Sequence, residues 1–156
     1  MKRVLFVCTG NICRSPTAEG VARHFIETGG LQHLVEVDSA ATYGYHVGEP
    51  PDPRAVQAAA KRGYDLSGLR ARKLMAQDYQ RFDLLLAMDH GHLKIMKSAC
   101  PEVYRPRVDL FLRYAPDSEF DEVPDPYYGG AKGFDLVLDL CEHAVTGLLD
   151  HLAHAR

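Results

Sequence analysis

Eight residues near the amino terminus, CTGNICRS, combine residue types that can together bind and attack an oxyanion. Cys8 supplies a sulfur nucleophile, and Arg14 supplies a planar cation whose N–H groups match two oxygens of a tetrahedral anion. Gly10 and Asn11 tolerate left-handed backbone angles, which let successive amides point toward one anion. Ser15 begins a predicted helix, whose positive end adds to the same site. The stretch therefore predicts a cradle for phosphate or a similar oxyanion.

The same groups would activate the sulfur at the base of the cradle. A cysteine in water is only a few per cent ionised at neutral pH, whereas amides, a helix dipole and the Arg14 cation all favour the thiolate. The Ser15 hydroxyl can donate a hydrogen bond to it. Taken alone, Cys8 could equally be the last residue of a buried strand, and Arg14 could equally be a solvated residue at the start of a helix. In combination they predict a nucleophile aimed at a bound anion, and the absence of Gly-Lys-Ser/Thr excludes a Walker-type nucleotide loop.

Apolar runs of strand length alternate with helical periodicity along the chain. Strands are expected at Val4–Val7, Val35–Ala40, Asp83–Met88 and Val108–Leu112. Helices are expected from Ser15-Pro16 to Gly29-Gly30, from Asp52-Pro53 to Gly63, shortly after Asp89, and from Phe134 to His151. This alternation predicts an α/β fold with a parallel sheet covered by helices on both faces. Cys8 then lies at the carboxyl edge, where such sheets bind ligands, and the irregular stretch 115–132 is expected to be a functional loop.

Length and charge limit the classes of partner. The 156 residues suit a single domain, 1–156, and a net charge of −3, from 18 basic and 21 acidic residues, favours neither nucleic acid nor an anionic membrane. No apolar run is long enough to span a bilayer, and the amino terminus resembles a signal peptide only superficially. We therefore expect a cytoplasmic protein. The sequence leaves the oligomeric state open.

The remaining cysteines and the histidines do not form a metal-binding pattern. Cys100 and Cys141 are expected to be buried, inert thiols, and no paired CxxC motif is present. His143 and His151 are poorly aligned for ligation on one helix. The sequence thus predicts neither a metal nor a cofactor, because Arg14 and the loop amides can neutralise a phosphate by themselves.

The whole pattern resembles the low-molecular-weight protein tyrosine phosphatases. CTGNICRS matches the Cys-x5-Arg-Ser loop of that family, and similar segments follow in order along nearly the whole chain: EVDSAAT, VGEPPDPRA, LRARKL, FDLLLAMD and PDPYYGG. The resemblance implies a four-stranded parallel sheet in the order 2-1-3-4. It also implies hydrolysis of phosphotyrosine in proteins, or of aryl phosphates, through a phosphocysteine intermediate.

The resemblance further implies roles for single residues. Cys8 resembles the nucleophile, Arg14 the phosphate clamp and Asp125 the general acid. The residues that bind phosphate or support the cradle are Thr9, Gly10, Asn11, Ile12, Cys13, Ser15 and Ser39, and the pocket walls are Ile12, Tyr45, Tyr127 and Tyr128. Many family members carry His-Gly after the second helix, where the histidine supports the loop asparagine. The pair here is Arg62-Gly63, so the support of Asn11 is expected to differ.

Cys13 has two interpretations. Its spacing from Cys8 is short enough, within a cradle, for the two to form a disulfide under oxidation, which would protect the nucleophile from irreversible oxidation. Equally, Cys13 is explained as a buried neighbour packed under the loop. Both interpretations stay open at this stage.

Three other functions compete with the tyrosine phosphatase. Arsenate reductases of the same fold need two further cysteines close together near the third strand, where FDLLLAMDHGHLKIM has none. Protein-arginine phosphatases carry a nearly identical loop but tend to have threonine in place of Ile12, and a bulkier wall favours a flat phenol. A non-catalytic phosphate-binding module would have no need of Cys8, Arg14 and Asp125 together.

Overall fold

The computed structural model describes residues 1–127 and 130–154. Four parallel strands form one sheet in the order β2-β1-β3-β4, as predicted. Their bounds are Lys2–Cys8 for β1, Val35–Ala41 for β2, Leu84–Ala87 for β3 and Val108–Leu110 for β4. The helix α1 spans Arg14–Thr28, α2 spans Pro53–Lys61, α3 spans Asp78–Arg81, α4 spans His90–Ala99 and α5 spans Gly130–His154. Two 3₁₀ helices, η1 (Glu102–Arg107) and η2 (Phe111–Tyr114), flank β4.

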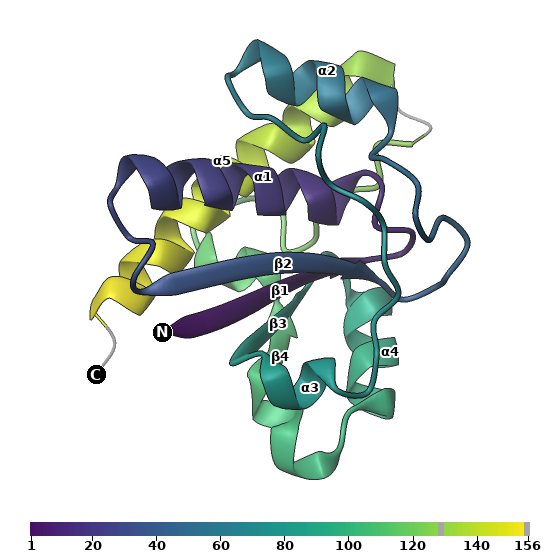
Figure 1. Ribbon diagram of the computed structural model, residues 1–156, viewed down its shortest axis with the longest axis vertical. Helices are drawn as coiled ribbons and strands as arrows, with labels where there is room; N and C mark the ends of the chain where they lie inside the picture. Colours follow the sequence, from purple (N-terminus) through teal and green to yellow (C-terminus); the bar gives the residue numbers. More distant parts are fainter. Residues whose placement is uncertain (128–129, 155–156) are drawn as a thin grey trace.

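The sheet separates two hydrophobic cores. Helices α1, α2 and α5 cover one face, and α3 and α4 cover the other (Figure 1). Alternate residues of β1 enter opposite cores: Val4 and Phe6 pack with α1 and α5, whereas Leu5 and Val7 pack with α3 and α4. All four side chains are fully buried. This two-sided burial explains why the strands read as continuous apolar runs rather than alternating ones.

Two aspartates begin helices as the sequence predicts. The Asp52 carboxylate accepts a 2.8 Å hydrogen bond from the Arg54 amide at the start of α2, and Pro53 occupies the first helical position. Asp89 does the same for α4, accepting 2.8 Å from the His92 amide. Gly63 has a φ of 88°, the left-handed angle expected just beyond the end of α2.

The structure differs from the prediction in three places. The fourth strand ends at Leu110 rather than Leu112, because Phe111 and Leu112 both turn into the α5 side of the core. Consecutive residues of a strand point to opposite faces, whereas a 3₁₀ turn lets both enter one core. Helix α5 begins at Gly130, inside the stretch expected to be irregular. The short segments α3 and η1 were not expected.

No helix formed by residues 1–127 and 130–154 is long and apolar enough to cross a membrane.

Candidate active site

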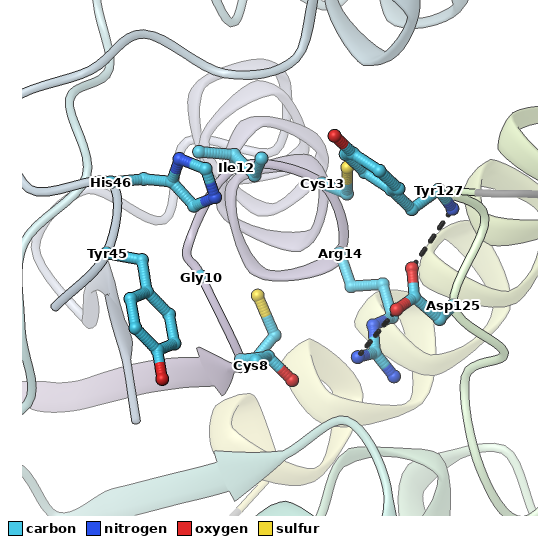
Figure 2. Close-up of a pocket in the computed structure, with 10 residues that line it drawn as sticks. Cys8, Gly10, Ile12, Cys13, Arg14, Tyr45, His46, Asp125 and Tyr127 are labelled. Carbon is cyan, nitrogen blue, oxygen red and sulfur yellow. Dashed lines mark hydrogen bonds and ion pairs between the residues drawn. The ribbon is translucent and has the colours of Figure 1, made fainter. Parts of the chain in front are cut away.

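A cavity of about 290 Å³ opens at the carboxyl end of β1. It is lined by Cys8, Thr9, Gly10, Ile12, Cys13, Arg14, Tyr45, His46, Asp125 and Tyr127. Figure 2 shows Tyr45 and His46 on one side of Cys8, with Arg14, Asp125 and Tyr127 on the other. The predicted residues Asn11, Ser15 and Ser39 do not line the cavity but are buried beside it. The remaining predicted wall residue, Tyr128, lies outside the described residues.

The Cys8 sulfur is held by the first turn of α1. Cys8 ends β1 and is 3% exposed. Its Sγ lies 2.9 Å from the Ser15 hydroxyl and accepts a 3.4 Å hydrogen bond from the Ser15 amide. The Ser15 hydroxyl oxygen already accepts 2.7 Å from the Asn11 amide nitrogen, so its proton is available for the sulfur. Both donors favour the thiolate, and the helix dipole points the same way.

Asn11 holds the loop in a left-handed turn. Its φ is 59°, and its Nδ2 donates to Ser15 and, at 2.9 Å, to the Ser39 hydroxyl. Its Oδ1 accepts 3.1 Å from the Arg72 amide. Gly10 was also expected to tolerate left-handed angles, but it does not adopt them. A Cβ at Gly10 would lie 2.9 Å from the His46 ring, so a larger residue there would displace that ring from the cavity wall.

The support of Asn11 continues into α1. The Ser39 hydroxyl donates 2.6 Å to the Glu19 carboxylate, which also accepts 2.7 Å from Arg23. Glu19 is almost completely buried, and burial raises the pKa of its carboxyl. The network therefore ties the cradle to β2 and to the body of α1 through partners that are shielded from water.

Arg14 is oriented by two partners outside the cradle. Its Nη1 donates 2.8 Å to Asp89 and 3.0 Å to the Val123 carbonyl. Burial raises the pKa of Asp89, but the His92 amide and Arg14 outweigh that effect and lower it. The charged Asp89 thus fixes the guanidinium plane. The other terminal nitrogen, Arg14 Nη2, lies 3.9 Å from Asp125 Oδ2.

Asp125 lies at the mouth of the cavity. Its side chain is 52% exposed, and its Oδ1 accepts a 3.0 Å hydrogen bond from the Tyr127 amide. Pro124 and Pro126 flank it and restrict the backbone on both sides. A carboxyl group in this position can reach the leaving oxygen of an ester whose phosphate occupies the cradle.

Comparison with known proteins assigns the family. The profile described as "Low molecular weight phosphotyrosine protein phosphatase" matches residues 3–156. The chain belongs to this family. It is 48% identical over 151 residues to the low molecular weight protein-tyrosine-phosphatase of Streptomyces coelicolor, covering 94% of this chain and 91% of that protein. The human phosphatase is 36% identical over 151 residues, covering 96% of this chain and 94% of the human protein.

A solved structure shares this fold. The protein tyrosine phosphatase of Entamoeba histolytica, crystallised with Hepes in the active site, superposes with a TM-score of 0.95 at 37% identity. The match covers 98% of this chain and 97% of the other. The fold implied by the phosphatase resemblance is therefore confirmed.

The arginine expected to correspond to the family's supporting histidine contacts α5 instead. Arg62 Nη1 lies 2.9 Å from both Asp139 and Glu142. The described partners of Asn11 are the hydroxyls of Ser15 and Ser39 and the Arg72 amide. In this phosphatase, Arg62 thus joins α2 to α5, and the cradle is supported from elsewhere.

Besides the supports Asp89, Arg72 and Glu19, three more residues at or beside the site were not predicted from the sequence. His46 lines the cavity and contacts Glu49 at 2.5 Å. Arg54 holds the segment after Asp125, with 2.9 Å from its Nη1 to the Tyr127 carbonyl. His92 lies 2.6 Å from the Thr9 hydroxyl through Nε2. Arg54 belongs to the family-like segment VGEPPDPRA, but the sequence gives no role for it, because all three residues reach the site through contacts made only in the fold.

Cys13 lines the same cavity as Cys8 and is almost completely buried. Burial, together with the nearby negative charges of Asp52, Cys8 and Asp125, raises the pKa of its thiol to about 12. Cys13 is therefore a neutral thiol at physiological pH. Among the described residues, no group of three or more His, Cys, Asp or Glu side chains is arranged to hold a metal ion.

Burial of His92 predicts a pH-dependent stability. Burial and the Arg14 charge lower the pKa of His92 from 6.5 to about 4. The unfolded chain therefore takes up a proton as the pH falls from 6.5 toward 4, while the folded chain does not, so stability falls across this window. Linkage gives a contribution of about 2 kcal/mol lost between pH 7 and pH 5. Urea unfolding of the wild type and His92→Gln at both pH values would measure it. An equal pH slope in the two proteins would contradict this assignment.

Proposed function

We propose that this protein hydrolyses phosphotyrosine in proteins, and aryl phosphates, through a phosphocysteine intermediate on Cys8. The observation that carries the proposal is the convergence of three groups on one cavity. The sulfur of Cys8 lies at its base, the Arg14 guanidinium at its side, and the Asp125 carboxyl at its mouth. A nucleophile, a clamp for phosphate oxygens and a proton donor are the parts that phosphate ester hydrolysis requires.

In the first step the Cys8 thiolate attacks phosphorus and the bond to the phenol oxygen breaks. Asp125 gives its proton to that oxygen, so a neutral phenol leaves rather than a phenolate. Arg14 and the loop amides bind the three equatorial oxygens, on which negative charge is spread in the transition state. The S–P bond of the phosphocysteine forms as the P–O bond is lost.

In the second step water cleaves the phosphocysteine. The Asp125 carboxylate left by the first step accepts a proton from the water, whose oxygen attacks phosphorus. The S–P bond breaks, the sulfur leaves as a thiolate, and inorganic phosphate is released. The Ser15 hydroxyl and amide, which lie 2.9 Å and 3.4 Å from Sγ, stabilise that leaving thiolate. No cofactor or metal is required in this scheme.

The walls of the cavity support an aromatic ester. Tyr45 and Tyr127 stand on opposite sides of the pocket, and Ile12 lines it between His46 and Cys13 (Figure 2). A flat phenol can pack between such surfaces, with its phosphate directed toward Cys8. These walls favour the phenol ester of a phosphoprotein over an alkyl ester.

The proposal also includes the assignment of all 156 residues to one phosphatase domain and a cytoplasmic location. The four unpaired cysteines fit a reducing compartment.

The cysteine positions argue against arsenate reduction. Cys100, at the end of α4, packs in one core, and Cys141, on α5, packs in the core on the other face of the sheet. Both are buried, and burial raises the pKa of each thiol. Two thiols separated by the sheet cannot pass a disulfide to one another.

The redox role of Cys13 stays a prediction, supported by its place in the cavity of Cys8.

Turnover of a matched peptide panel tests the proposal. The panel holds three versions of one peptide, which carry phosphotyrosine, phosphoserine or phosphoarginine at the same position. We expect phosphate release from the phosphotyrosine version to have the highest kcat/KM. A preference of at least about tenfold corresponds to little more than 1 kcal/mol of transition-state binding, which the aromatic walls can supply. Faster release from phosphoarginine would support the arginine phosphatase instead. Phosphate binding without any turnover would support the non-catalytic module.

A further inference from the structure

The segment that carries Asp125 is anchored on its amino-terminal side by the cradle arginine. Val123 is fully buried, and its amide donates 2.8 Å to the Met88 carbonyl at the end of β3. Its carbonyl accepts 3.0 Å from Arg14. The backbone two residues before Asp125 is therefore fixed to the sheet and to the phosphate clamp.

A second arginine anchors the carboxyl-terminal side. Two residues after Asp125, the Tyr127 carbonyl accepts 2.9 Å from Arg54 Nη1. The Arg54 guanidinium carbon also lies 5.1 Å from the centre of the Tyr127 ring and 5.0 Å from that of Phe134 on α5. Such stacking helps to hold the planar cation in place, in addition to its hydrogen bond.

Arg54 is itself held by Asp52, which touches the cradle. The Asp52 carboxylate accepts 3.1 Å from Arg54 Nε and 2.9 Å from Nη2, a pairing of two parallel N–H groups with one carboxylate. The Asp52 amide donates 2.8 Å to the Ile12 carbonyl in the loop that binds phosphate. A continuous series of contacts thus runs from Ile12 through Asp52 and Arg54 to Tyr127.

The contacts that begin at Ile12 end at Asp125, the proposed proton donor. The Tyr127 amide donates 3.0 Å to Asp125 Oδ1, so the residue that Arg54 holds also orients the carboxyl. Arg54 does not line the cavity that the described residues form; it lines a separate groove between α2 and α5. Arg54 therefore acts on the reaction through its neighbours: Tyr127 connects it to the proposed acid, and Asp52 connects it to the cradle.

We propose that Arg54 is a positioning residue for proton transfer by Asp125. The inference rests on the proposed function and adds a residue to it. Removal of Arg54 takes away the hydrogen bond to the Tyr127 carbonyl and the stacking on the Tyr127 ring, and the carboxyl group then samples positions away from the leaving oxygen. Misplacement by about 1 Å can cost as much as roughly 10²-fold in rate, and an exposed, partly restrained carboxyl should lose about tenfold.

The choice of leaving group separates this role from a structural one. Phenyl phosphate needs a proton on its leaving oxygen, whereas 2,4-dinitrophenyl phosphate does not. For Arg54→Gln we expect about tenfold lower kcat/KM with phenyl phosphate and less than about twofold with the dinitrophenyl ester. The inhibition constant of inorganic phosphate should stay within about twofold, because the cradle is unchanged. Equal losses with both esters, or no loss with either, would overturn the inference.

Arg62→Gln is the matched control. Arg62 ends the same helix and joins it to α5 through Asp139 and Glu142. Its loss removes ion pairs between α2 and α5 without touching Tyr127. We expect the wild-type rate with both esters, whatever the change in melting temperature. A leaving-group effect in Arg62→Gln equal to that in Arg54→Gln would assign the effect to helix packing and overturn the inference.

A double-mutant cycle completes the test. In an Asp125→Asn background, Arg54→Gln should cause no further loss with phenyl phosphate; a full second loss would show that Arg54 acts elsewhere. If Arg54→Gln does not fold, Arg54→Lys serves, because one ammonium group cannot reproduce the paired contacts to Asp52 and the donation to Tyr127. Absence of turnover in the wild type would refute the proposed function, whereas an unaltered Arg54 variant beside an active wild type would refute only this inference.

Discussion

A Cys8→Ser variant is expected to lose turnover of aryl phosphates while still binding inorganic phosphate. A serine hydroxyl is hardly ionised at neutral pH, so neither the hydrogen bonds from Ser15 nor the Arg14 cation can make it a comparable nucleophile. Removal of a covalent nucleophile costs on the order of 10⁶-fold in other enzymes. The cradle amides and Arg14 remain, so the affinity for phosphate should change little.

Two measurements check this expectation. Release of para-nitrophenol reports turnover, and calorimetric titration with inorganic phosphate reports binding. Cys100→Ser is the matched control, since Cys100 is buried beneath α4 and takes no part in the proposed chemistry. Retention of most of the wild-type rate by Cys8→Ser would remove Cys8 as the nucleophile. Loss of phosphate binding would instead show that the sulfur holds the cradle together.

An Asp125→Ala variant is expected to lose about 10²- to 10⁴-fold in kcat/KM with phenyl phosphate, the usual contribution of a general acid. The loss should be much smaller with 2,4-dinitrophenyl phosphate, whose leaving group departs without a proton. Steady-state rates with the two esters provide the comparison. Since the Arg14–Asp125 separation is 3.9 Å, removal of this carboxylate should leave the clamp in place, held by Asp89 and Val123.

Asp121→Ala provides the control for this prediction. Asp121 belongs to the same loop and is exposed, and its carboxylate contacts the His90 ring at 2.8 Å. Its loss removes a negative charge near the site without removing the proposed acid, so both esters should be hydrolysed at close to the wild-type rate. Equal losses with both esters in Asp125→Ala would rule out proton donation by that residue.

The fold was predictable because its signals are local. The apolar runs at β1, β2 and β3 and the capping aspartates before α2 and α4 each lie within a few consecutive residues. The cradle was predictable for the same reason, since Cys8, Asn11, Arg14 and Ser15 belong to one loop. Where neighbours in space decided the conformation, prediction was wrong: β4 ends early because Phe111 and Leu112 share one core.

The supporting residues could not be predicted because they are distant in sequence. Thr9 and His92 are 83 positions apart, and Arg54 and Tyr127 are 73 positions apart. The residues next to His92 and Arg54 in the sequence do not predict these contacts. Gly10 and Asn11 were both expected to tolerate left-handed angles, and of these two Asn11 adopts them. The Asn11 side chain is held there because it donates to the Ser39 hydroxyl on β2 and accepts from the Arg72 backbone amide.

One wall of the pocket, Tyr45, belongs to neither hydrophobic core. Tyr45 is 79% exposed, and Val47 beside it is 58% exposed, whereas Cys8, Asn11, Arg14, Ser15 and Ser39 are buried. Exposed side chains of this kind can usually be exchanged within about 0.5 kcal/mol of folding stability. Evolution, or a protein engineer, can therefore remodel which esters this enzyme accepts at positions that folding does not constrain, while the reactive loop is preserved intact.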